Sequence, residues 1–176
     1  MTVQVQDTAA AQNLAAMPVD SLIDHILARY HEIHRHELPA LIALARKVER
    51  VHHDVPNAPL GLADALEGLA IELDVHMKKE ELVLFPAMRR GLKDGIAEPI
   101  AMMRHDHDDH DETIRKVEEL ASGFAVPAGA CGSWQNLYAG GRKLCDDLRQ
   151  HIHIENNVLF PRFELAGKGR CICAHG

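Results

Sequence analysis

The stretch HMKKEELVLFP, residues 76–86, recurs as HIHIENNVLFP at residues 151–161. Both copies carry a His, a Glu four residues later, and then Val-Leu-Phe-Pro. An internal repeat exposes the unit from which a fold is built. Each unit here contains two side chains that can bind a metal, so the repeat bears on both the architecture and the site.

On a helix, the two copies place the same residue types on the same face. Leucines lie at offsets of −7, −3 and +8 from His76, and at the same offsets from His151. At about 100° per residue, these leucines share one side of the helix with the His and with Glu80 or Glu155. A buried His and Glu without partners would be strongly destabilising. A metal ion bound between them would remove that penalty.

The rest of the chain also follows a helical pattern, because Leu and Ala recur at helical spacing and alternating β-branched runs are absent. We therefore expect an all-α fold, with helices at about residues 20–52, 60–90, 98–121 and 134–165. Pro or Gly stands at each break. We expect an N-terminal tail at 1–17, a single bundle domain at 18–166 and a Cys-containing C-terminal tail at 167–176.

Two further histidines extend the repeat into both halves of the chain. His31 stands 45 residues before His76, and His105 stands 46 residues before His151. Each half then supplies His, His and Glu to the interior of an antiparallel four-helix bundle. Four imidazoles with two carboxylates favour a non-haem pair of iron ions over a single zinc ion. The predicted metal ligands are His31, His76, Glu80, His105, His151 and Glu155.

Other polar residues near this pattern are weaker candidates. Glu72 and Asp147 each stand four residues before a repeat histidine, where they could orient ligands, line a channel or relay protons, or simply be surface carboxylates. His34 lies one turn past His31, and both His34 and Asp109 are candidates for contact with a ligand. The remaining histidines, including His107 and His110, are expected to be mostly solvated.

Composition excludes several classes of partner. The formal net charge is −7, and the 19 basic residues are scattered, so neither a nucleic acid nor an anionic membrane is an expected partner. The chain has no signal-peptide pattern and no apolar run long enough to cross a bilayer, and we expect a cytoplasmic protein. Its four cysteines do not suggest a disulfide framework in a domain of this size.

With these residues identified, the chain resembles hemerythrin-like domains, and among them the repair-of-iron-centres (RIC) proteins. The segments IDHILARYHEIHRHELP, ELDVHMKKEELVLFP and DDLRQHIHIENNVLFPR carry the resemblance, which covers about residues 20–163. It implies that the four predicted histidines are terminal iron ligands and that Glu80 and Glu155 bridge two irons beside an oxo or hydroxo group. Oxygen-carrying hemerythrins have a fifth His where this chain has Asp109, which argues against a simple oxygen carrier.

The resemblance also implies a function in nitrosative or oxidative stress. The protein would repair damaged iron–sulfur clusters or supply iron to them, and would bind nitric oxide at the di-iron site. Two alternatives stay open: a cytoplasmic nitric oxide scavenger in denitrification, and an oxygen or redox sensor. Weak nitric oxide reduction would make the protein an enzyme, whereas otherwise it is an iron donor or a gas-binding protein.

The cysteines near the C-terminus are a separate motif. Many RIC proteins carry an N-terminal domain with a Cys-Cys pair, and we expect this chain to be a short form without it. The sequence CICAHG places Cys171, Cys173 and His175 within five residues. They could form a metal or thiol site, although an unstructured tail is the simpler interpretation.

Overall fold

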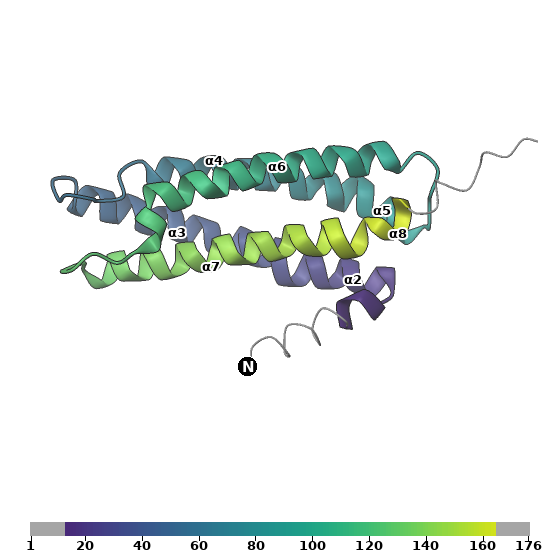
Figure 1. The fold of residues 1–176 in the computed structure, drawn as a ribbon, viewed down its shortest axis with the longest axis horizontal. Coiled ribbons are helices and arrows are strands. Elements are labelled where there is room, and N and C mark those ends of the chain that lie inside the picture. Colours follow the sequence, from purple (N-terminus) through teal and green to yellow (C-terminus); the bar gives the residue numbers. More distant parts are fainter. Residues whose placement is uncertain (1–12, 165–176) are drawn as a thin grey trace, which may run out of the picture.

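The computed structural model describes residues 13–164, which form an all-α bundle (Figure 1). The elements are α2 (Val19–Ile26), η1 (Leu27–His31), α3 (Glu32–Val51), α4 (Leu62–Lys79), η2 (Glu80–Leu84), α5 (Phe85–Arg89), α6 (Ala97–Leu120), η3 (Ser122–Phe124), α7 (Gly132–Ile154), η4 (Glu155–Leu159) and α8 (Pro161–Glu164). They merge into four long rods close to the four predicted helices. The predicted tails fall mostly outside the described residues, so the domain boundaries stay a prediction.

The four rods pack as a ring around one interior. Helix α3 packs against α4 and α7, and α6 packs against the same two helices. The connection into α4 ends at Gly61, whose φ of 87° places it in the left-handed region that glycine adopts without strain. This arrangement brings the two copies of the repeat, on α4–η2 and α7–η4, into the same bundle.

Three π-helical turns interrupt these rods, and the sequence pattern did not predict them. The turn η2 begins at Glu80, whose carbonyl accepts the N–H of Phe85, and η4 begins at Glu155, whose carbonyl accepts the N–H of Phe160 at 2.9 Å. A proline, which has no N–H to donate, follows each of these phenylalanines. Such wide turns occur often at functional sites. Both repeated glutamates therefore lie at the start of a wide turn.

The buried apolar residues form two clusters along the bundle. One is built mainly from α3, α4, α7 and the second half of α6, and includes Leu69 and Leu144. The other is built from residues of α2, η2, α5, the start of α6, η4 and α8, and it includes Phe85 and Phe160. The repeat histidines and glutamates lie between these clusters. They form a buried polar layer that both apolar clusters shield from water.

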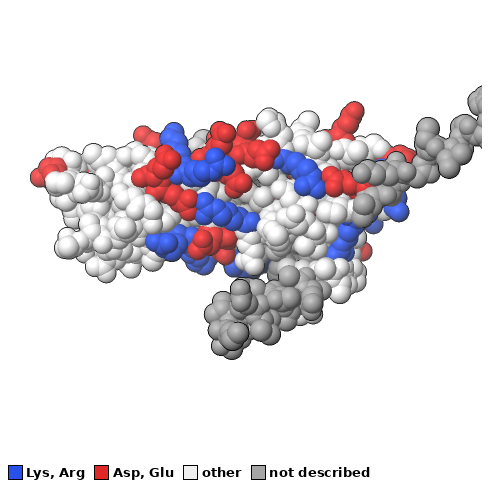
Figure 2. All heavy atoms as spheres, in the orientation of Figure 1, with Lys and Arg blue, Asp and Glu red and all other residues white. Residues whose placement is uncertain are grey.

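The outer surface of the bundle is highly charged and mixed in sign. Figure 2 shows acidic and basic side chains intermingled along the middle of one face, without a broad basic patch there. Several of these charges pair between helices, as in the contact of Arg149 with Glu118 at 2.7 Å. Within residues 13–164, none of the helices is both long enough and apolar enough to span a membrane.

Candidate metal centre

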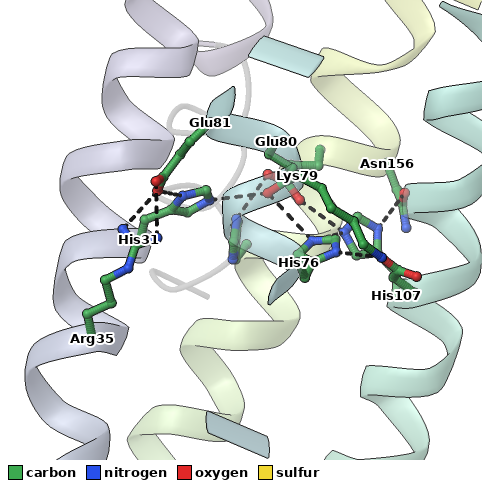
Figure 3. A network of polar contacts seen from close by, with 11 residues as sticks. His31, Arg35, His76, Lys79, Glu80, Glu81, His107 and Asn156 are labelled. Carbon is green, nitrogen blue, oxygen red and sulfur yellow. Dashed lines mark hydrogen bonds and ion pairs between the residues drawn. The ribbon is translucent and has the colours of Figure 1, made fainter. Parts of the chain in front are cut away.

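The repeated His–Glu pairs meet in the middle of the bundle. Their potential ligand atoms form two groups, and within each group all the atoms lie within 4.8 Å of one another. The groups are His31, Glu80, His151 and Glu155, and His76, Glu80, His107 and Glu155. Both glutamates belong to both groups. Figure 3 shows Glu80 between His31 on one side and His76 and His107 on the other.

The spacing of these atoms suits metal coordination. Nε2 of His31 lies 3.3 Å from Oε2 of Glu80, and Nε2 of His151 lies 3.0 Å from Oε1 of Glu155. In the second group, Nε2 of His107 lies 3.1 Å from Oε2 of Glu155. Two ligand atoms at right angles, each about 2.1 Å from a metal, are about 3 Å apart. The observed separations therefore match neighbouring corners of a coordination polyhedron.

The second group contains two imidazoles whose inner nitrogens face each other. Nε2 of His76 and Nε2 of His107 are 3.1 Å apart. Nδ1 of His76 lies 3.3 Å from a carboxylate oxygen of Asp106, and Nδ1 of His107 lies 3.0 Å from Oδ1 of Asn156. Because these outer oxygens accept hydrogen bonds, the ring protons belong on Nδ1. Burial lowers the pKa of His107, but its contact with Glu155 outweighs burial and raises the pKa overall. When both rings are neutral, two lone pairs point at each other, an arrangement that a cation between them would stabilise.

Charged side chains support the outer nitrogens of the ligand histidines (Figure 3). Nδ1 of His31 donates to Glu81 at 2.7 Å, and Arg35 donates to both oxygens of Glu81 at 2.8 and 3.1 Å. On the other side, Lys79 donates to Asp106 at 2.7 Å. Burial raises the pKa of Glu81, but Arg35 and His31 outweigh it and lower the pKa overall. Hydrogen bonds of this kind fix the tautomer and orientation of a metal-binding histidine.

The geometry gives the repeated phenylalanine a contact in the site. Phe85 stacks on the ring of His31 with a centroid distance of 5.8 Å, and Phe160 stacks on His107 at 5.9 Å. The residue after each repeated glutamate contacts the histidine on which the phenylalanine of that copy stacks. Glu81 binds His31, and Asn156 binds His107. Each copy of the repeat therefore contributes its own His and Glu and also positions a histidine from another helix.

The structure corrects the prediction of His105 as a ligand. The side chain of His105 is 76% exposed, and it lies 4.0 Å from Asp109 on the outside of α6. His107, expected to be solvated, is buried in the ligand group. Two residues along a helix correspond to a rotation of about 200°, so these two side chains point to opposite sides. The buried residues of α6 alternate at spacings of three and four, and this signal could have identified the ligand: Ile100, Met103, His107, His110, Ile114 and Val117.

Among the weaker candidates, His34 lies closest to the centre. It is fully buried, and its ring centroid is 5.7 Å from that of His151. Asp147 instead accepts hydrogen bonds from Arg29 at 2.8 Å and from Lys143 at 2.9 Å. Asp147 therefore links two rods through these pairs, and the hydrogen bonds to the outer nitrogens of the ligand histidines come from other residues.

The remaining two candidates lie toward solvent. Glu72 accepts a hydrogen bond from the hydroxyl of Thr113 at 3.1 Å, and the side chain of Asp109 is 64% exposed. Sequence reasoning missed the residues that support the ligands: Glu81, Asp106 and Asn156. Two of these directly follow the repeated glutamates, and that position was the available signal.

Electrostatics distinguish the two buried glutamates. Burial, together with repulsion from Glu155, raises the pKa of Glu80 well above its usual value. Burial also opposes ionisation of Glu155, but attraction from His151 and the other nearby histidines holds its pKa well below the usual value. Burial lowers the pKa of His31 to about 4 and that of His76 to about 3. Neutral imidazoles are the form that binds metals.

The hydrogen bonding of the inner atoms also fits a metal. Nε2 of His31, both carboxyl oxygens of Glu80 and Oε2 of Glu155 are buried without a hydrogen bond among the described residues. Each such atom costs about 1–3 kcal/mol when left unsatisfied. All of them belong to the two ligand groups. The site is therefore able to hold metal, and a bound cation would satisfy these four atoms.

Comparisons with known proteins agree with this reading. The family model for the hemerythrin HHE cation binding domain matches residues 22–163. The iron–sulfur cluster repair protein YtfE of Pectobacterium atrosepticum is 44% identical over 88% of this chain and 74% of its own length. The iron–sulfur cluster repair protein DnrN of Neisseria gonorrhoeae is 46% identical over 84% of this chain and 92% of its own length.

A third relative, YtfE of Salmonella paratyphi B, is 42% identical over 94% of this chain and 74% of its own length. It too is named an iron–sulfur cluster repair protein. The match to the family model spans the whole buried layer, from His31 to Glu155. This chain therefore belongs to the hemerythrin HHE cation-binding family, within the group that contains the YtfE and DnrN iron–sulfur cluster repair proteins.

Proposed function

We propose that the protein holds two iron ions in the buried centre and supplies iron to damaged iron–sulfur clusters. The observation that carries this proposal is the sharing of Glu80 and Glu155 by both ligand groups. A carboxylate between two metals can bind each of them with one oxygen. Two such carboxylates, with two imidazoles on either side, form a paired site and do not suit a single ion.

The ligand types favour iron over the other common metals. Structural zinc is usually four-coordinate with thiolate or imidazole ligands, and magnesium or calcium prefers a set of oxygen ligands. Four imidazoles with two shared carboxylates suit non-haem iron. Such a site lacks thiolates, which hold soft metals most tightly. Release of iron to an acceptor therefore fits the ligand chemistry.

Two metal positions in this centre would differ in their access to solvent. The ligands His31 and His76 are about equally buried, at 0% and 2% exposed, so the two positions differ in what surrounds them. Asp106, which supports His76, and Lys79 line a cavity of about 670 Å³ on the surface between α4 and α6. We therefore expect the ion held by His76 and His107 to exchange first.

The protein's own residues have separable tasks in this proposal. Glu80 would bind metal as a carboxylate, and its raised pKa makes loss of a proton favourable only when the metal is bound. Glu81 and Asp106 keep the ring protons of His31 and His76 on the outer nitrogens. The two apolar clusters exclude water from the layer. Bound iron would supply a position for a small ligand such as nitric oxide or oxygen.

The test is an anaerobic transfer assay. Iron-loaded protein is mixed with an iron–sulfur enzyme whose cluster has lost iron, and the iron content of both proteins is measured as enzyme activity returns. Transfer should be biphasic, with one ion leaving faster, and Asp106→Asn should accelerate the fast phase. His105→Ala serves as the matched control, because that side chain lies on the outside of the same helix. Absence of transfer at any protein ratio would refute iron supply.

The same preparation distinguishes the two alternatives. Capture of nitric oxide predicts an iron-nitrosyl signal from the reduced protein while its iron stays bound. Sensing predicts a ligand-dependent change in small-angle scattering or in partner binding. Zinc in place of iron in the purified protein would contradict the di-iron assignment.

A further inference from the structure

A second cluster of metal-capable side chains lies beside the centre, in the cavity between α4 and α6. Four carboxylates line this cavity, together with two ammonium groups: Glu72, Asp106, Asp109, Glu112, Lys79 and Lys116. The carboxylates outnumber the ammonium groups, and Lys79 is already paired with Asp106 at 2.7 Å. The ionised side chains that line the cavity therefore carry a net negative charge, which favours a cation.

Acidic surface residues alone do not make a site, but His110 adds an independent observation. His110 lines the same cavity, although its side chain is only 3% exposed. Its Nδ1 is buried and has no hydrogen-bond partner in the described part of the chain. A buried imidazole nitrogen without a partner is costly. The ring that carries this nitrogen lines the cavity and can offer an imidazole ligand to a cation there.

The packing of α4 on α6 brings oxygen ligands to the cavity that His110 lines. Asp106 stands one turn before His110 on α6, so both side chains face the same way. Thr113 stands one turn after His110 and donates a hydrogen bond to Glu72 of α4 at 3.1 Å. Glu72 and Asp106 therefore line the same cavity as His110, one from each of the two helices that form it.

The cavity is a neighbour of the centre and is separate from it. The ring of His110 lies 4.8 Å from the ring of His76 and 6.4 Å from that of His107, measured between centroids. Within residues 13–164, only the two ligand groups of the centre bring three or more ligand atoms within 4.8 Å of one another. Side chains in the cavity must rotate to bind an ion, so binding there should be weaker than in the centre.

We propose that this cavity is a third metal position, in which His110 and the carboxylates of Glu72 and Asp106 bind one divalent cation. One imidazole with two carboxylates suits ferrous iron or manganese. This proposal rests on the proposed function, because the new position lies beside a centre that is taken to hold two irons. An ion in the cavity would lie between the buried centre and solvent.

The test is a titration of the full chain, with its centre already loaded with iron, using Mn(II) under anaerobic conditions. Electron paramagnetic resonance of free Mn(II) gives the number of ions bound. The wild type should bind one additional equivalent. His110→Ala should weaken that equivalent by at least about tenfold, since loss of a supporting residue alone costs a metal site about that much. His105→Ala removes the same residue type from the exposed side of α6 and should leave the equivalent unchanged.

Two results would overturn the proposal. One is a wild type that binds no additional Mn(II), and the other is His110→Ala and His105→Ala titrating alike. Glu72→Gln, which changes only an exposed residue, should also weaken the equivalent and guards against misfolding of the His110 variant. The iron content of the centre is measured separately in each sample. A centre that fails to hold two irons refutes the proposed function. A wild type that holds two irons but binds no additional Mn(II) refutes only the third position.

Discussion

Replacing Glu80 by glutamine should separate the metal role of this residue from its role in folding. Glu80 is fully buried, and its two oxygens accept no hydrogen bond among residues 13–164. Burial and the neighbouring Glu155 raise its pKa well above the usual value, which favours the protonated form when no metal is bound. Glutamine is neutral and has nearly the same shape. We therefore expect the metal-free variant to unfold within about 1 kcal/mol of the wild type.

The metal-loaded proteins should differ much more. Free metal at about 1,000 times Kd stabilises a folded protein by about 4 kcal/mol. For a chain of this length, each kcal/mol raises Tm by about 2–4 °C. Loss of a shared anionic ligand should weaken metal binding by at least about 100-fold, or about 2.7 kcal/mol. At equal free metal, the Tm gain on loading should therefore be smaller by about 5–10 °C in Glu80→Gln.

Differential scanning calorimetry of metal-free and iron-loaded samples measures both quantities, and Mössbauer spectra report whether two irons are coupled. Glu32→Gln is the control, because Glu32 is exposed and directly follows a ligand histidine. A metal-free Glu80→Gln protein that is destabilised by several kcal/mol would contradict the expectation that the protonated form of Glu80 is favoured without metal. A full Tm gain with coupled irons in the variant would refute the shared ligand.

Three other predictions concern the site, the pH dependence and the packing. His107→Ala should lose at least one of two bound metals by elemental analysis, whereas His105→Ala should keep both. The metal-free protein should lose stability as pH falls from about 6.5 to 4, because four buried histidines have pKa values of about 3 or 4 in the folded protein and bind protons on unfolding. At pH 5, each of them should lower the free energy of unfolding by about 2 kcal/mol, measurable by urea titration. Gly141→Ala places its Cβ 2.5 Å from the ring of Phe124 and should destabilise the protein by about 1–3 kcal/mol in chemical denaturation. The Cβ of Gly68→Ala meets no atom within 4 Å, so this variant should stabilise α4 by about 1 kcal/mol.

The sequence by itself determined the helical rods and the two repeated His–Glu pairs. Helical periodicity is a local property, so His76 and Glu80 could be placed on one apolar face from their neighbours alone. The same reasoning applied to His151 and Glu155, and all four side chains are buried in the structure. Local pattern was sufficient there because each repeated pair lies within one turn of a leucine stripe.

Only the tertiary structure decided which histidine of the third helix enters the centre. The segment HDHDDH offers three histidines within six residues, and the matching of distances along the chain selected His105. The rotation of α6 about its axis is fixed by its packing on α4 and α7, and this rotation buries His107 and His110 while exposing His105. Glu81 and Asn156 reach histidines on other helices, so their contacts depend on how the rods are placed. Local periodicity specifies a face of each helix, but convergence of ligands from four helices is a property of the packed bundle.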